Sequence, residues 1–279
     1  MLNALTIDVE DYYQVSAFES SVRFEEWPTH ESRVEKNTTR LLGILDEYGV
    51  KGTFFVLGWE AERRPRMIEE IVARGHEIGS HGYRHRLVYS MTPAECHDDI
   101  ARSKACLESI TGTPVIGFRA ASYSIVARST WCLDVLIDLG FKYDSSIFPI
   151  RHDRYGIPDA PRFPHVLARR QGSIVEFPLS TVRRLGLNLP IAGGAYLRFW
   201  PGWVIRAGIR RINRVEGQPA IIYLHPWELD PDQPRLKGPL KSRIRHYTNL
   251  EKTESKLRRL LGAFAFGRVR DVLKERGLL

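Results

Sequence analysis

Cysteine is scarce in this sequence, and long apolar runs are missing from it. The chain has three cysteines in 279 residues and no Cys-x-x-Cys pair. Cys96 and Cys106 fall on one expected helix about 15 Å apart, which is too far for a disulfide, so we expect free, reduced thiols. The longest apolar runs have only the length of strands, so the sequence predicts no transmembrane helix.

The first residues also lack the basic and apolar segments of a secretory signal. Asp8, Glu10 and Asp11 stand where a signal peptide would be apolar. We therefore expect a soluble, cytoplasmic protein.

Acidic residues are outnumbered, because 41 Lys and Arg against 33 Asp and Glu give a net charge of +8. Such a surface suits a nucleic acid, an anionic membrane face or an acidic glycan, although we favour helix faces solvated by Lys and Arg over any one of these explanations. The 43% hydrophobic content is enough for a sizeable core, which excludes a disordered chain. Much of the basic surplus lies near the C-terminus, at Arg206, Arg210, Arg211, Arg214, Lys237, Lys241, Arg243, Arg245, Arg258 and Arg259.

Short apolar segments alternate with helical patterns, which predicts an α/β fold with a parallel sheet. The first part of this alternation places strands at 4–8, 52–58, 76–79, 115–118 and 141–143, and helices at 34–48, 65–74, 93–112 and 127–139. After Phe148 the regularity loosens. There we expect strands at 174–178 and 220–224, a flexible loop over a site at 193–196, and helices at 203–215, 249–261 and 266–276.

Charged side chains and imidazoles follow several of these strands. His81 and His85 are four residues apart, so in a helix both rings would share one face and hold one metal ion. The spacing alone is a weak signal. It gains weight because carboxylates follow the first strand and His225 ends a late one, as in α/β enzymes whose active sites lie at the carboxyl ends of strands.

A long segment, 12–33, separates the first strand from the first helix and is rich in aromatic residues. A loop of this length is usually functional, and its composition argues against disorder. Two interpretations are equally open: the rings stack on sugar, or they form a local apolar cluster. The aromatic residues are Tyr12, Tyr13, Phe18, Phe24 and Trp27.

Five segments together resemble the polysaccharide deacetylase (NodB-homology) family, carbohydrate esterase family 4. They match its motifs in order and spacing over about residues 4–226, which is far more specific than any one motif. The segments are Thr6 to Asp11, His81 to His85, Phe118 to Ser122, Tyr143 to Ser146 and Tyr223 to His225. The stretches around Asp144, His225 and Tyr247 look like the subgroup associated with exosortase and exopolysaccharide gene clusters.

The resemblance implies a distorted, incomplete (β/α) barrel of the polysaccharide deacetylase type. Residues 1–227 would form the catalytic domain and residues 228–279 a C-terminal helical extension. The implied activity is metal-dependent hydrolysis of the acetamide of an N-acetylhexosamine, in a polysaccharide or its lipid-linked precursor, with release of acetate. The partner is then an N-acetylated glycan; we expect no nucleic acid, and an anionic membrane surface as a peripheral contact.

The resemblance also assigns a metal site and a base. His81 and His85 would hold a divalent ion, Zn²⁺ or a similar ion such as Co²⁺, with either Glu10 or Asp11 as the third ligand. Asp8 would be the general base, kept ionised and oriented by Arg119. A backbone N–H near Ser122 or Tyr123 would meet the oxyanion.

On the opposite side, His225 would be the general acid, with its pKa held up by Asp144. Leu224 would line the acetyl pocket. The family's aspartate-tryptophan pair is Asp144-Ser145 here, so Trp227 is our candidate for the aromatic wall. Two further departures are Gly82 in place of the hydroxyl residue between the histidines, and Ala120-Ala121 in place of prolines.

Two other functions remain open on the sequence alone. The first is an allantoinase-like hydrolase of another C–N bond, although such relatives tend to lack the complete metal triad. The second is a non-catalytic binder of glycan or nucleic acid that uses the basic surface.

Overall fold

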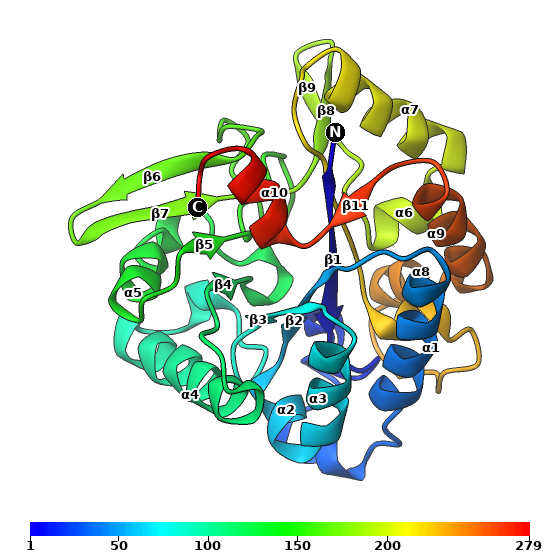
Figure 1. Ribbon diagram of the computed structural model, residues 1–279. Coiled ribbons are helices and arrows are strands. Elements are labelled where there is room, and N and C mark those ends of the chain that lie inside the picture. Colours follow the sequence, from blue (N-terminus) through cyan, green and yellow to red (C-terminus); the bar gives the residue numbers. More distant parts are fainter.

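Strand β1 (Asn3–Val9) is the second strand in the order of the sheet in the computed structural model, which describes residues 1–279 (Figure 1). All of its residues are buried, as expected for an apolar strand with neighbours on both edges. It pairs in parallel with β10 (Ile221–Leu224) on one edge and with β2 (Thr53–Val56) on the other. The strand order is β10-β1-β2-β3-β4-β5-β7-β6.

The first part of the chain alternates strands with helices, which confirms the predicted repeat. The sequence patterns missed only one helix of this part, α2, which begins directly after β2. The elements are α1 (Val34–Glu47), α2 (Gly58–Arg63), α3 (Pro65–Ala73), β3 (Glu77–Ser80), α4 (Pro93–Thr111), β4 (Gly117–Phe118), α5 (Cys132–Asp138) and β5 (Tyr143–Asp144).

Helix α4 shows how local sequence sets these boundaries. The Thr92 hydroxyl accepts from the Glu95 N–H, and the Glu95 carboxylate accepts from the Thr92 N–H at 2.8 Å, with Pro93 at the first helical position. Gly112 ends the helix with a left-handed φ of 63°.

The second part of the chain is less regular and adds antiparallel pairs. β6 (His165–Arg169) pairs antiparallel with β7 (Gly172–Glu176), and β8 (Thr181–Arg184) pairs with β9 (Leu187–Pro190) in a separate hairpin. None of the helices combines the length and apolar composition needed to cross a membrane. The helices of this part are α6 (Ala195–Phe199), α7 (Gly202–Arg214), α8 (Leu240–Tyr247), α9 (Thr253–Leu261) and α10 (Val269–Glu275).

Two expectations for this part need correction. Residues 266–276 begin with a short strand, β11 (Phe266–Gly267), which pairs in parallel with the start of β1 before α10 follows. The chain therefore returns to the central sheet near its end, as Figure 1 shows. The expected loop over the site is instead packed on β10: Gly193 bridges Tyr223, and a Cβ on Gly194 would lie 2.6 Å from the Tyr223 hydroxyl.

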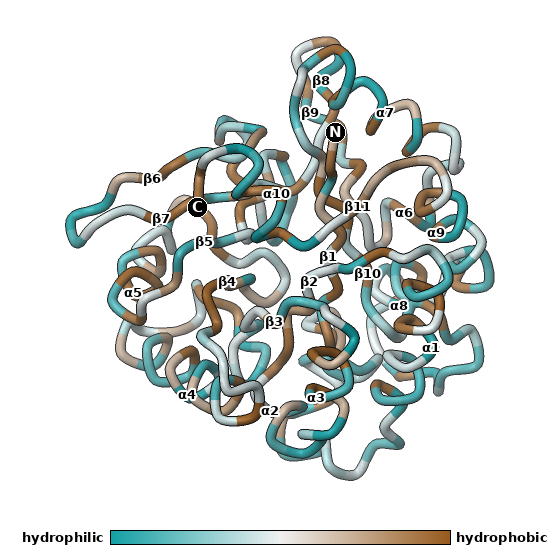
Figure 2. The backbone as a smooth tube through the Cα atoms, viewed as in Figure 1, coloured by the Kyte–Doolittle hydropathy of each residue, from teal (hydrophilic) through white to brown (hydrophobic).

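The aromatic segment 12–33 forms two 3₁₀ helices, η1 (Ser16–Phe18) and η2 (Phe24–Thr29), and its rings are mostly buried. They pack in one apolar cluster with rings from distant segments, which favours the second of the two interpretations. Figure 2 shows apolar residues along strand β1 and polar residues along outer loops. The cluster includes Tyr12, Tyr13, Phe18, Trp27, Trp59, Tyr83 and Trp227.

Candidate metal and catalytic site

The carboxyl ends of four parallel strands bring most of the expected site residues together. β1, β3, β4 and β10 each deliver side chains to this edge of the sheet. Hydrogen bonds, ion pairs and close ligand atoms join them into one buried group: Asp8, Glu10, His81, His85, Arg119 and His225.

Glu10, His81 and His85 form the metal-binding part of this group. One ligand atom from each lies within 4.8 Å of the others, and all three residues are buried. Oε2 of Glu10 faces Nε2 of His85 at 2.8 Å but accepts no aligned hydrogen bond. A buried carboxylate oxygen without a donor is unfavourable unless a cation meets it. One carboxylate with two imidazoles therefore fits a divalent ion such as Zn²⁺, with coordination positions left open.

The neighbours of the two histidines orient their rings for such an ion. Nδ1 of His81 lies 2.7 Å from the carbonyl oxygen of Arg119, which can only accept, so Nδ1 carries the proton and Nε2 keeps its lone pair. Burial lowers the pKa of His81 to about 4, which favours the neutral ring that binds a metal. Burial alone would raise the pKa of Glu10, but His85 and His225 hold it below its usual value.

His81 and His85 do not lie on a helix, so the helical case considered for their spacing does not apply. The segment is a loop, with positive φ angles of 75° at Gly82 and 52° at His85. Asp99 on α4 holds this loop by accepting from the Tyr83 N–H at 2.7 Å. The turn brings the two imidazole centroids to 5.2 Å.

Asp11 is not part of the metal group, so the structure favours Glu10 among the two candidates. Asp11 Oδ2 accepts from the N–H groups of Arg33 at 2.7 Å and Val34 at 3.0 Å, and from the Ser32 hydroxyl at 2.9 Å. These are the unpaired donors at the start of α1, and Asp11 satisfies them.

Asp8 and Arg119 form the base side of the site. Nη1 of Arg119 lies 2.7 Å from Asp8 Oδ1, and both side chains are almost fully buried. Arg119 also donates to the Thr6 hydroxyl at 2.7 Å and to the Ser145 carbonyl at 3.0 Å, which fixes its plane. Burial would lower the pKa of Arg119, but Asp8 raises it, so the guanidinium stays charged. The Tyr123 hydroxyl donates to the other Asp8 oxygen at 3.3 Å.

His225 does not lie opposite Asp8 as expected, because its Nε2 is 3.9 Å from Asp8 Oδ2. Its side chain is partly open to solvent, with 16% exposed. Its Nε2 lies 3.4 Å from Glu10 Oε1, and its Nδ1 lies 3.6 Å from Glu228 Oε1. Burial would lower the pKa of His225, but Glu10 and Glu228 raise it to about 9. These carboxylates favour the protonated imidazole, which can act as an acid.

The expected pair between Asp144 and His225 is not formed. Asp144 accepts from the Ser146 hydroxyl at 2.5 Å and lies beside Glu176, and burial raises its pKa. In the sheet, β1 to β4 separate β5 from β10, which carries His225. The acid beside Nδ1 of His225 is Glu228, which the sequence patterns did not reveal although it lies only three residues farther along.

Glu228 is itself held by Arg198 of α6, a second residue that the sequence analysis missed. Nε of Arg198 lies 3.1 Å from Glu228 Oε1, and both side chains are buried. Burial would raise the pKa of Glu228, but Arg198 and His225 lower it. Arg198 also donates to the carbonyls of Arg245 at 2.8 Å and His246 at 2.9 Å, so it ties α8 to the site.

Trp227, our candidate for the aromatic wall, is buried beside the site. Its ring stacks on His225 with centroids 4.9 Å apart and on His246 with centroids 4.0 Å apart. Its Nε1 donates to Glu10 Oε1 at 3.2 Å, which helps to place the metal-binding carboxylate. Leu224 is fully buried in β10.

Ser122 and Tyr123 lie in a tight turn with positive φ angles of 49° and 54°. The Tyr123 N–H donates to the Ala120 carbonyl at 3.1 Å, so Ser122 provides the available backbone N–H of the two. The Ser122 hydroxyl contacts that of Ser16 at 2.8 Å.

A cavity of about 320 Å³ lies next to this turn. Ser122, Tyr223 and Tyr196 line it, together with His152 and Tyr155, whose rings stack at 3.8 Å. The loop around His152 therefore lies close to the Ser122 turn. Aromatic walls of this kind suit a ring-shaped ligand that presents apolar faces.

Comparisons with known proteins divide the chain at the same point where its regularity changes. Residues 20–143 match the family described as "Polysaccharide deacetylase". Residues 145–274 match a domain of unknown function, DUF3473. His81, His85 and Arg119 lie in the first match, and His225 and Glu228 lie in the second.

Named relatives agree with the first match. A peptidoglycan deacetylase from Helicobacter pylori is 31% identical over 113 residues, which are 40% of this chain and 38% of that protein. A chitooligosaccharide deacetylase from Bradyrhizobium sp. is 31% identical over 99 residues, which are 36% of this chain and 43% of that protein. The chain thus spans only about two fifths of the length of these relatives.

A solved structure supports the fold over nearly the whole chain. The protein, from Mycobacterium smegmatis, bears the name polysaccharide deacetylase; it covers 98% of this chain and 89% of its own, with a TM-score of 0.65 and 21% sequence identity. This likeness confirms the α/β fold of that group.

Proposed function

We propose that this chain, whose residues 20–143 match the polysaccharide deacetylase family, is a metal-dependent N-deacetylase of N-acetylated glycans. The family match and the named relatives support a hydrolase acting on C–N bonds other than peptide bonds. One observation carries the proposal. A buried Glu10–His81–His85 cluster lies next to Asp8 and His225, which have the chemistry of a base and an acid.

Glu10, His81 and His85 would hold the divalent ion, for which Zn²⁺ and Co²⁺ are our candidates. When bound, such an ion makes water a better nucleophile and polarises the acetyl carbonyl. Nε2 of His81 is free for this role because its Nδ1 is engaged by the Arg119 carbonyl.

Proton transfer is assigned to Asp8 and His225. Asp8 accepts a proton from the attacking water while Arg119 holds the carboxylate in place. The N–H of Ser122 is the protein donor for the oxygen that becomes negative. His225 gives its proton to the nitrogen as the C–N bond breaks, so acetate and a free amine leave.

Glu228 takes the supporting role that the sequence gave to Asp144. It contacts Nδ1 of His225 and is fixed by Arg198, so it orients the imidazole and stabilises its charged form. The acid side of this chemistry is therefore supported mainly from the second part of the chain.

The substrate class follows from the relatives and the cavity. The relatives are named for peptidoglycan and chitooligosaccharides, and the aromatic lining beside Ser122 suits a sugar ring. We propose an N-acetylhexosamine unit in a polysaccharide or its lipid-linked precursor, with cytoplasmic action and membership of the exosortase-associated subgroup. An incomplete barrel over residues 1–227 with an extension at 228–279 remains part of this proposal.

The test is acetate release from a panel of N-acetylated glycans, with chelated protein and with added Zn²⁺ or Co²⁺. We expect no release after chelation, release after metal is restored, and none from an Asp8→Asn variant that still binds metal. Undiminished release after thorough chelation would reject the metal role.

A further inference from the structure

The hairpin β8–β9 and helix α7 form a surface that the proposed active site does not use. From Phe177 to Val215 the sequence has seven arginines and no aspartate, glutamate or lysine. The acidic residue closest in sequence to α7, Glu216, is already paired with Arg162 at 2.8 Å and with Arg211 at 3.4 Å. The exposed charges of the hairpin and of α7 are therefore all positive.

Exposed apolar side chains gather on the same elements. Seven of the thirteen large apolar side chains that are exposed in the whole molecule lie between Leu185 and Val215. Leu185, at the tip of the hairpin, is 94% exposed, Leu187 is 67% exposed, and Trp203 at the start of α7 is 66% exposed. Isolated exposed apolar residues are common on soluble proteins, but a cluster marks an interaction surface.

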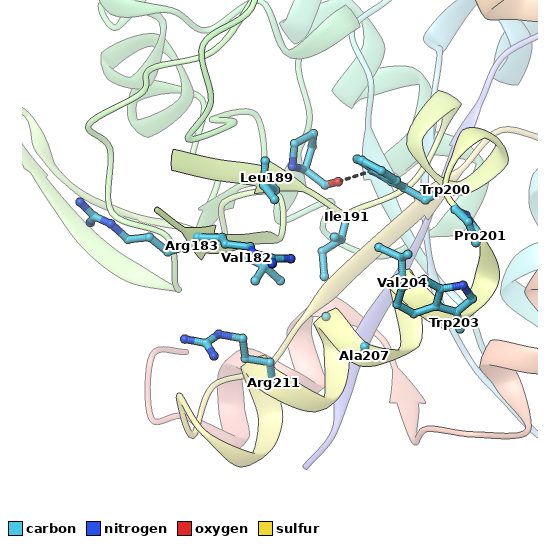
Figure 3. A pocket seen from close by; sticks show the side chains of 13 residues that line it. Val182, Arg183, Leu189, Ile191, Trp200, Pro201, Trp203, Val204, Ala207 and Arg211 are labelled. Carbon is cyan, nitrogen blue, oxygen red and sulfur yellow. Dashed lines mark hydrogen bonds between the residues drawn. The ribbon is translucent and has the colours of Figure 1, made fainter. Parts of the chain in front are cut away.

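An apolar groove of about 720 Å³ lies between these elements (Figure 3). Figure 3 shows Trp200 and Trp203 at one end and Arg183 and Arg211 at the other. The backbone of α7 at Gly208 packs closely against the Ile191 side chain in this groove, because a Cβ at Gly208 would lie 2.8 Å from that side chain. The Trp200 Nε1 also donates to the Pro190 carbonyl at 3.1 Å, which joins the hairpin to the start of α7.

The charges on this surface decide between occupants. A second copy in a symmetric contact would place arginines against arginines, which is unfavourable. A nucleic acid would satisfy the arginines but not the exposed leucines at the hairpin tip. A bilayer with anionic headgroups satisfies both, since apolar and Trp side chains enter the headgroup boundary while arginines meet phosphates.

We propose that the β8–β9 hairpin and α7 form a docking surface for an anionic lipid bilayer. Leu185, Leu187 and Trp203 enter the boundary between headgroups and acyl chains, and Arg183, Arg184 and Arg211 bind lipid phosphates. Phe199 at the end of α6 lines the cavity beside Ser122, and the next residue, Trp200, lines the groove. Docking would therefore hold the proposed active site close to the membrane.

The test is sedimentation of the full chain with vesicles. Vesicles of phosphatidylcholine alone are compared with vesicles containing phosphatidylglycerol at low and at physiological salt. We expect binding only to the anionic vesicles and weaker binding at higher salt. The double variants Leu185→Ser/Trp203→Ser and Arg183→Gln/Arg184→Gln should each lose about tenfold in vesicle partitioning.

The other exposed hairpin, β6–β7, supplies a matched control. Val166 is 53% exposed on it and Arg170 is exposed at its turn. Val166→Ser/Arg170→Gln changes the same types of residue and should leave vesicle binding unchanged. The single variant Leu185→Ser protects the test against misfolding, because its side chain is almost entirely in solvent. Acetate release from a soluble glycan reports the active site separately and should not change in any of these variants.

Three results would overturn the proposal. One is equal binding of the groove variants and the control variant. Another is the absence of binding to phosphatidylglycerol vesicles. The third is a protein that does not bind vesicles but forms a dimer in light scattering, with the Trp203→Ser variant monomeric. The occupant of the surface would then be a second copy of the chain.

Discussion

The two parts of this chain, before and after residue 144, build the site in different ways. In the first part, side chains reach the site from the ends of neighbouring parallel strands, and Asp8 and Arg119 pair directly across β1 and β4. In the second part, His225 depends on contacts between separate segments, through Glu228 and Arg198 to α8. The positions of Asp8, Arg119 and His225 thus follow from the strand ends, whereas the residues that support His225 depend on long-range packing.

Replacing Asp8 tests the first part and should have the largest effect. Asp8→Asn removes the proton acceptor with little change in shape, so kcat should fall about 10³-fold. Metal content should stay the same, because Asp8 is outside the Glu10–His81–His85 cluster. Acetate release and metal analysis on one preparation check both statements, and normal turnover would exclude Asp8 as the base.

Replacing Arg198 tests the packing of the second part. Arg198→Met leaves the buried Glu228 without its cation and three backbone carbonyls without their donor. The free energy of unfolding should fall by about 3 kcal/mol. The exposed Arg23–Glu26 pair is the control, and Arg23→Met should change stability by less than about 0.5 kcal/mol. Equal effects in urea unfolding would contradict this contrast.

Glu60, a buried glutamate of the first part, should make the stability of the protein depend on pH. Burial raises the pKa of Glu60 on α2 to about 7, although Arg64 acts against it. Because the unfolded value is 4.5, its stabilising contribution is complete below that pH and is lost as the pH rises through 7. From pH 5 to pH 8 the native protein should lose on the order of 2 kcal/mol of unfolding free energy relative to the Glu60→Gln variant, which has no carboxyl group to titrate at this position. A difference independent of pH would show that Glu60 does not titrate in this range.

The smallest expected effect separates Glu228 from Asp144. Glu228→Gln should lower kcat about tenfold and leave KM unchanged, because Glu228 positions His225 and is not placed at the substrate cavity. Asp144→Asn should lower kcat less, since Asp144 contacts Ser146 and Glu176 instead of His225. Steady-state kinetics on both variants decides the matter, and the reverse order would restore the pairing that the sequence suggested.

The regular part of the fold was predictable because its signals are local. Thr92, Pro93 and Glu95 mark the start of α4 by capping chemistry that needs no tertiary contact. The converging positions of Asp8, Arg119 and His225 also followed from the strand ends. The choice between Glu10 and Asp11 did not, because it depends on where α1 begins: Asp11 serves that helix.

The unpredicted features depend on contacts between distant segments. His81 and His85 approach through a loop that Asp99 holds, which their four-residue spacing alone does not reveal. Glu228 lies only three residues after the Tyr223 to His225 segment and could have been found there. Arg198 and His246 carry no local signal, since only the packing of α6 and α8 brings them to Glu228 and Trp227.

Metal analysis of purified variants tests the central claim most directly. Elemental mass spectrometry after loading with Zn²⁺ and gel filtration should find one ion for each chain in the native protein and in Asp11→Asn. Glu10→Gln, His81→Ala and His85→Ala should each lose it. Retention of the ion in all three variants, with native folding by circular dichroism, would contradict the site described here.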